Sequence, residues 1–94
     1  VCMPAVLQFN KPAIKDTLAE AANYLDISGG FDGFCKFVDD LNDSLAIPKS
    51  LAGLGIKNPD IDRIVSGALI DPSTGGNPIK MTDENTRKLV VEIC

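Results

Sequence analysis

The sequence predicts an all-α protein of four to five helices, formed as a single helical domain over residues 1–94. Apolar residues recur every three to four positions in several long segments, which is the spacing of an amphipathic helix. Glycine, proline and capping residues stand between these segments, where helices begin and end. No segment alternates apolar and polar residues over a length that would indicate a strand.

The N-terminal part of the chain contains two expected elements. Residues 1–9 form an apolar segment that is helical or extended. Asn10 is a suitable cap for a following helix, and Pro12 would lie just inside that helix, where its missing N–H costs nothing. Apolar side chains at helical spacing over residues 13–25 predict this second helix, and Ser28-Gly29-Gly30 ends it.

Residues 31–45 are the expected core helix. Aromatic side chains bury the largest area per residue, so an aromatic stripe favours a core position. This stripe contains three phenylalanines: Phe31, Phe34 and Phe37. Pro48 lies beyond the end of the helix, and a single capped turn over residues 50–55 follows it.

Two capping signals mark the remaining helices. Asn58-Pro59 joins a cap residue to a proline and predicts the start of a helix. Thr82 predicts the N-cap of the last helix, whose first turn carries Asp83 and Glu84 near the positive end of the helix dipole.

The segment between these two helices has residues that suit a particular backbone shape. It reads Asp71-Pro72-Ser73-Thr74-Gly75-Gly76-Asn77-Pro78. The prolines fix φ, the glycines permit positive φ, and the polar side chains can hydrogen-bond to nearby main chain. We therefore expect an ordered loop.

Composition and charge limit the partners of the chain. The net charge is −4 and no basic run is present, which argues against a nucleic-acid surface. No apolar stretch reaches the roughly 18 residues of a membrane span, and no segment resembles a signal peptide. We expect neither nucleic acid nor membrane as a partner.

The residue types that carry most side-chain catalysis are scarce. The chain has no histidine, so it cannot form a Ser-His-Asp or Cys-His triad, and it lacks the commonest transition-metal ligand. Its three cysteines are far apart and odd in number, which is typical of reduced thiols in a cytoplasmic protein. Asp39, Asp40 and Asp43 are interpreted as a solvated helix face rather than a cation site. We assign no catalytic residue.

The chain is expected to be a piece of a larger protein. It opens with an apolar run at Val1, and 45% of its residues are hydrophobic, which is high for so small a unit. Such a piece would pack against an upstream part, and alone it would expose apolar surface and self-associate.

Three motifs resemble those of a known family. Residues 3–10, MPAVLQFN, are similar to the L-P-x-V-x-x-F-N segment of the iron-containing (group III) alcohol dehydrogenases. Residues 47–56, IPKSLAGLGI, resemble the family's G-I-P-x-x-L-x-x-x-G-V turn. Residues 71–78, followed by Thr82, resemble its D-x-x-x-x-x-N-P…T loop. The three motifs occur in the family's order, with compatible gaps, and extend from residue 3 to residue 82, so the resemblance spans essentially the whole chain.

The resemblance implies a parent enzyme with two domains and a dehydroquinate-synthase-like fold. An N-terminal α/β domain would bind NAD(P), and a C-terminal helical domain would hold a divalent metal, iron or zinc, while hydride passes between a small alcohol or aldehyde and the nicotinamide. This chain would be the last part of the helical domain. We expect it to be inactive alone, with no cofactor-binding residue, and neither to bind NAD(P)H nor to reduce an aldehyde.

The resemblance also bears on individual residues. In members that have it, the last histidine ligand of the metal follows the proline of L-P-H-V, and in this chain that position is Ala5. We therefore assign no metal ligand. Ser73 and Thr74 are expected to line the substrate pocket; the alternative is that their loop is only a structural connector.

A second interpretation of the chain comes from another class of protein. It is a free-standing helical module that binds a partner through the stripe Phe31, Phe34 and Phe37.

Overall fold

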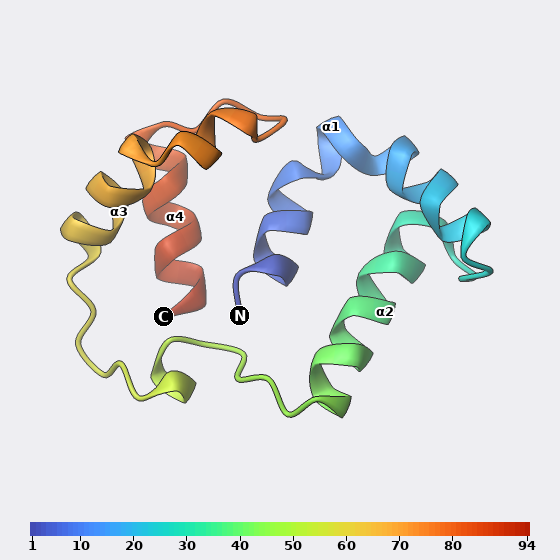
Figure 1. Ribbon diagram of the computed structural model, residues 1–94, viewed down its shortest axis with the longest axis horizontal. Coiled ribbons are helices and arrows are strands. Elements are labelled where there is room, and N and C mark those ends of the chain that lie inside the picture. The colour runs from blue at the N-terminus through green and yellow to red at the C-terminus, as the bar shows by residue number, and fades with distance from the viewer.

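The computed structural model describes residues 1–94 as four α-helices and two short 3-10 helices, without strands (Figure 1). The all-α prediction is confirmed. The elements in chain order are α1 (Met3–Tyr24), α2 (Gly30–Ser44), η1 (Ala52–Leu54), α3 (Ile61–Ile70), η2 (Pro72–Gly76) and α4 (Asp83–Ile93).

The helices pack mainly as two pairs, α1 with α2 and α3 with α4, and α1 also contacts α4. Figure 1 shows the two pairs on the two sides of an open ring. The molecule is flat, with extents of 40 × 30 × 18 Å. At one end of the ring the backbone N–H groups of Leu51 and Ala52 donate to the carbonyls of Ile93 and Cys94, at 2.7 and 3.3 Å. At the other end the segment after η2 approaches α1.

Helix α1 runs unbroken through Asn10 and Pro12, so the expectation of two elements with Asn10 as a cap is wrong. Pro12 has no N–H to donate to the carbonyl of Gln8, and Figure 1 shows α1 bent part-way along its length. The two halves remain one helix because Leu7, before the proline, and Ile14, after it, pack against the same core.

The main core lies between α1 and α2. It is made of Leu7, Phe31, Cys35 and Val38, with Ile14, Leu18 and Phe34 packed against it. Burial of one large apolar side chain stabilises a fold by about 1.5–3 kcal/mol, so Phe31, only 3% exposed, is a principal contributor. Phe37 is 46% exposed, so the predicted three-phenylalanine core stripe is wrong at that position. The reason is that α1 covers only the face of α2 that carries Phe31 and Val38.

Helices α1 and α2 end in the same way. After α2, Ile47 N–H donates to Asn42 O at 2.9 Å, and Ala46 adopts a left-handed φ of 54°. After α1, Asp26 has a φ of 57° in the equivalent position. This is the Schellman arrangement, in which glycine is usual because a Cβ is strained at positive φ.

The caps of the last two helices differ in how well the sequence indicated them. Thr82 caps α4, as predicted, and it does so in a capping box: Asn85 N–H donates to Thr82 Oγ1 at 3.2 Å and Thr82 N–H to Asn85 Oδ1 at 2.7 Å. The expected cap at Asn58 is wrong, because α3 begins two residues later and Asp60 accepts the N–H of Arg63 at 3.0 Å. The carboxylate of Asp60 is the stronger acceptor for the helix start.

Candidate functional site: a groove beside the 71–78 loop

The loop between α3 and α4 is ordered by its own side chains. The carboxylate of Asp71 accepts the N–H of Ser73 at 2.7 Å, and Thr74 Oγ1 donates to the carbonyl of Ala68 in α3 at 2.6 Å. These bonds hold η2 against the end of α3. Gly75 and Gly76 do not use positive φ, and a Cβ at either would meet nothing within 4 Å.

An open groove of about 600 Å³ lies between this loop, α1, α3 and α4. Its apolar wall comes from Val6 and Phe9 of α1 and from Leu89 of α4. Ser73 and Thr74 also line the groove, so both residues predicted for a substrate pocket belong to one hollow. An apolar lining with a few hydroxyl groups suits a small organic molecule that has one polar end.

The two hydroxyl groups of the groove differ in their freedom. The Thr74 hydroxyl already donates to Ala68 O, which leaves it able to accept one further hydrogen bond. Ser73 is exposed and its hydroxyl has no hydrogen-bond partner in the chain, so it can both donate and accept. Ser73 is therefore the better candidate for contact with a bound molecule.

Asn10 is the residue of this region that sequence reasoning misassigned. Its side chain is 4% exposed and forms two reciprocal hydrogen bonds with Asn77: Asn10 Nδ2 to Asn77 Oδ1 at 2.8 Å and Asn77 Nδ2 to Asn10 Oδ1 at 2.9 Å. Asn77 lines the groove. The sequence does offer one indication of the pair: Asn10 lies in an apolar stretch. If that stretch is one continuous helix, the amide is buried and needs a hydrogen-bond partner.

Comparisons with known proteins identify the family. The model described as "Fe-containing alcohol dehydrogenase family, C-terminal" matches residues 1–94. The chain belongs to this family. It is 29% identical over 94 residues to a 4-hydroxybutyrate dehydrogenase of Cupriavidus necator, with 96% of this chain and 24% of that protein covered.

A second curated relative is the NADPH-dependent butanol dehydrogenase of Clostridium saccharobutylicum. It is 26% identical over 98 residues, which cover 95% of this chain and 25% of the relative. The chain thus spans about a quarter of the length of these two relatives. No solved structure matches the chain significantly.

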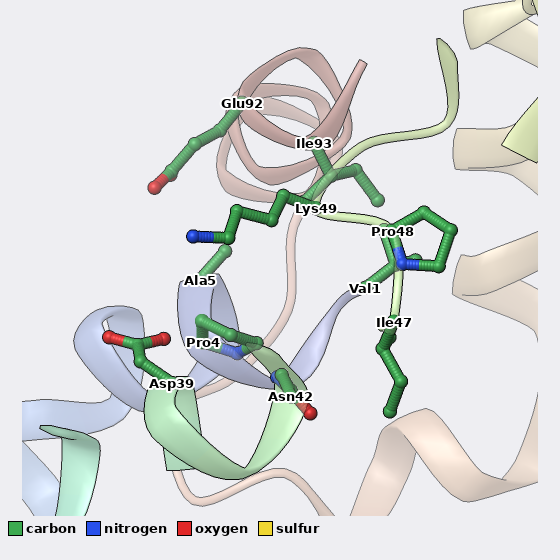
Figure 2. A pocket seen from close by; sticks show the side chains of 10 residues that line it. All are labelled: Val1, Pro4, Ala5, Asp39, Asn42, Ile47, Pro48, Lys49, Glu92 and Ile93. Carbon is green, nitrogen blue, oxygen red and sulfur yellow. The ribbon is translucent and has the colours of Figure 1, made fainter. Parts of the chain in front are cut away.

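A second cavity, of about 270 Å³, bears on the metal that is implied by an iron-containing family (Figure 2). Ala5 lines it together with the carboxylates of Asp39 and Glu92 and the ammonium of Lys49. Lys49 also forms an ion pair with Asp43 at 3.1 Å. The side chain of Ala5 is a methyl group and can donate no electron pair.

The donor set of the chain does not fit that metal. No three His, Cys, Asp or Glu side chains lie close enough together to hold an ion. A site for iron or zinc usually takes three or more such protein ligands. Residues 1–94 therefore do not form such a site by themselves, and we derive no step of the reaction from a metal held by them alone.

The remaining titratable groups of interest act in structure. Burial raises the pKa of the Cys35 thiol, the charges of Asp32 and Asp39 raise it further, and Lys11 opposes them. A thiol of raised pKa is a weak nucleophile near neutral pH. Hydrogen bonds to Asp62 and Asp83 raise the pKa of Arg87, whose guanidinium thereby links α4 to α3. None of the helices has the length and apolar character needed to cross a bilayer.

Proposed function

We propose that this chain forms the C-terminal helical part of an NAD(P)-dependent alcohol dehydrogenase that interconverts small alcohols and aldehydes. The observation that carries the proposal is the groove lined both by apolar side chains and by Ser73 and Thr74, in a chain of the iron-containing alcohol dehydrogenase family. The two relatives are named as dehydrogenases of 4-hydroxybutyrate and of butanol, and each of these two small molecules carries an alcohol group.

In this proposal the larger protein supplies the cofactor and the metal. When bound, the nicotinamide would supply or accept the hydride, and a divalent metal, iron or zinc, held by upstream residues would polarise the substrate oxygen. This chain supplies one wall of the substrate pocket. Val6, Phe9 and Leu89 contact the carbon chain of the substrate, and the free hydroxyl of Ser73 lies beside it.

The small core supports an upstream partner within the same protein. Only 10 of the 94 residues are buried, which is few for a domain of this length. Large apolar side chains remain in solvent, among them Tyr24 at 87%, Ile70 at 84% and Leu45 at 61% exposure. We propose that the upstream part of the dehydrogenase covers them. The isolated chain should instead self-associate, which light scattering over a concentration series would detect.

The substitution Ser73→Phe, made in the full-length dehydrogenase, tests the pocket. Phenylalanine would occupy part of the groove, so kcat/KM should fall more for long alcohols than for short ones. Ser66→Phe is the matched control, because Ser66 is exposed on α3 and does not line the groove. If the ratio of kcat/KM between long and short alcohols is the same in Ser73→Phe as in the control, the loop is a structural connector and the pocket role is wrong.

Two further measurements test the division of labour. The purified 94-residue chain should neither bind NAD(P)H nor reduce an aldehyde, and any turnover from it would contradict the proposal. The separate cysteine thiols fit a cytoplasmic setting, which we propose for the enzyme. Fractionation of cells that produce the full-length protein would test this location.

A further inference from the structure

We propose that Asn10 and Asn77 are a positioning pair that sets the width of the groove and thereby the size of alcohol or aldehyde that it accepts. This inference rests on the proposed function, because it assigns to the pair an effect on the same substrate pocket. Neither residue is argued to touch the reacting atoms.

The side chains of Asn10 and Asn77 form a closed pair of hydrogen bonds. Each amide donates to the oxygen of the other, at 2.8 and 2.9 Å, and Asn77 Nδ2 also donates to the carbonyl of Ile79 at 2.7 Å. The two N–H donors of Asn77 are therefore both used within the protein. A planar amide pair with two parallel bonds fixes distance and orientation together, which apolar packing alone does not do.

The Asn10 side of the pair is buried. Asn10 is 4% exposed, so water cannot replace Asn77 as its partner without a rearrangement of the chain. A buried amide that loses its partner remains desolvated and unsatisfied. The pair therefore strongly favours the one arrangement of loop and helix in which both sets of bonds form.

The pair joins α1 to the 71–78 loop, and residues of both line the groove. Val6 and Phe9, which form its apolar wall, lie on α1 within one turn of Asn10. Asn77 follows η2 directly, three and four residues after Thr74 and Ser73. A shift at the amide pair thus changes the separation of the apolar wall from the hydroxyl side.

The 71–78 loop is anchored by hydrogen bonds at two places. Thr74 Oγ1 holds the start of the loop to Ala68 of α3, while Asn77 holds its end to α1. If the Asn77 anchor is removed, the loop is still tied to α3 but no longer to α1. The groove then widens or narrows without loss of the α3–α4 pair.

The test uses Asn10→Leu in the full-length dehydrogenase, because leucine has nearly the shape of asparagine but makes no hydrogen bond. We expect KM for the longest accepted alcohol to change by about tenfold, the scale of one unsatisfied buried polar group, while kcat for the shortest alcohol stays within about twofold. Asn10→Ala is the second variant: it removes both hydrogen bonds to Asn77 and adds neither bulk nor charge. It should change KM in the same direction, and it serves if Asn10→Leu does not fold.

Two control variants separate positioning from general loss of stability. Gln8→Leu makes a similar change on an exposed position of the same helix and should leave every KM unchanged. Asp60→Ala removes the cap of α3 far from the groove and should lower stability without altering selectivity. If Asn10→Leu behaves as Asp60→Ala does, with no change in selectivity, the pair is only structural and the inference is overturned.

A measurement without turnover distinguishes failure of the inference from failure of the proposed function. In the full-length dehydrogenase without substrate, Asn10→Leu should change the hydrogen–deuterium exchange of the backbone amides of Ser73 and Thr74, and unchanged exchange would overturn the inference. If Ser73→Phe alters selectivity in the enzyme but Asn10→Leu does not, the pocket stands and the positioning role is wrong. If neither variant alters selectivity, both are wrong.

Discussion

Gly33 is the position at which a single methyl group should do most harm to this fold. It lies in the first turn of α2, and its N–H donates to Gly29 O at 3.1 Å. A Cβ at Gly33 would lie 1.8 Å from the carbonyl oxygen of Ser28 and 2.7 Å from its carbonyl carbon. Both atoms are backbone and cannot rotate aside, so the chain before α2 must move by more than an ångström.

Two opposing effects decide the size of the loss for Gly33→Ala. Helix propensity favours alanine by about 1 kcal/mol. Overpacking costs about 1–3 kcal/mol, and a clash with rigid backbone belongs at the upper end. The free energy of unfolding should therefore fall by about 2 kcal/mol, which urea denaturation followed by circular dichroism would measure.

Gly67→Ala is the matched control for this experiment. Gly67 lies inside α3, and a Cβ there would meet nothing within 4 Å. Only the propensity gain remains, so the free energy of unfolding should rise by up to about 1 kcal/mol. The reasoning is refuted if both alanine variants shift stability in the same direction, or if Gly33→Ala unfolds at the wild-type urea concentration.

Three smaller changes can be tested by the same denaturation assay. Thr82→Ala removes half of the capping box and should cost about 1 kcal/mol; no change in the midpoint would exclude the cap. Ala46→Gly relieves a Cβ at a φ of 54° and should gain about 0.5–1 kcal/mol, after the greater freedom of glycine in the unfolded chain is subtracted; a loss would contradict the strain. Because burial raises the pKa of the Cys35 thiol, the folded chain holds this proton to higher pH than the unfolded chain. The protonated thiol therefore makes its full contribution to the free energy of unfolding below the ordinary thiol pKa of about 8.5, and this contribution is lost as the pH rises through the pKa of the folded chain. Cys35→Val should weaken the decline in stability at alkaline pH, and an unchanged decline would exclude this cause.

The features that the sequence predicted correctly are those encoded within a few residues. Thr82 and Asn85 satisfy each other's backbone across one helical turn, so the start of α4 is a local property. The turn closed by Gly55 is local in the same sense, with a φ of 88° that glycine accepts. Ser73 and Thr74, which the family resemblance indicated for a substrate pocket, line one groove, and their contact with a substrate stays a prediction.

The incorrect predictions concern features that depend on distant partners. Asn10 and Pro12 are typical of a helix start, and local rules alone favour a break there. The helix continues because Leu7 and Ile14, on the two sides of the proline, pack against one core, while the amide of Asn10 finds its partner 67 residues away. No short-range pattern contains these contacts. Phe37 was misassigned for a related reason: helical period places it on an apolar face, but only the arrangement of α1 decides how much of that face is covered.

The groove depends on how the two helix pairs are held together. The contacts within a pair differ in physical character from the contacts between the pairs. Apolar burial is non-directional and joins α1 to α2 within one pair. Between the pairs, α1 contacts α4 and Asn10 hydrogen-bonds to Asn77, while Leu51 and Ala52 of the connecting segment donate to the last residues of α4. A directional bond fixes distance and orientation where it forms, whereas a patch of apolar contact permits sliding. A pocket formed between the two pairs therefore takes its shape from a few polar side chains, although its walls are mostly apolar.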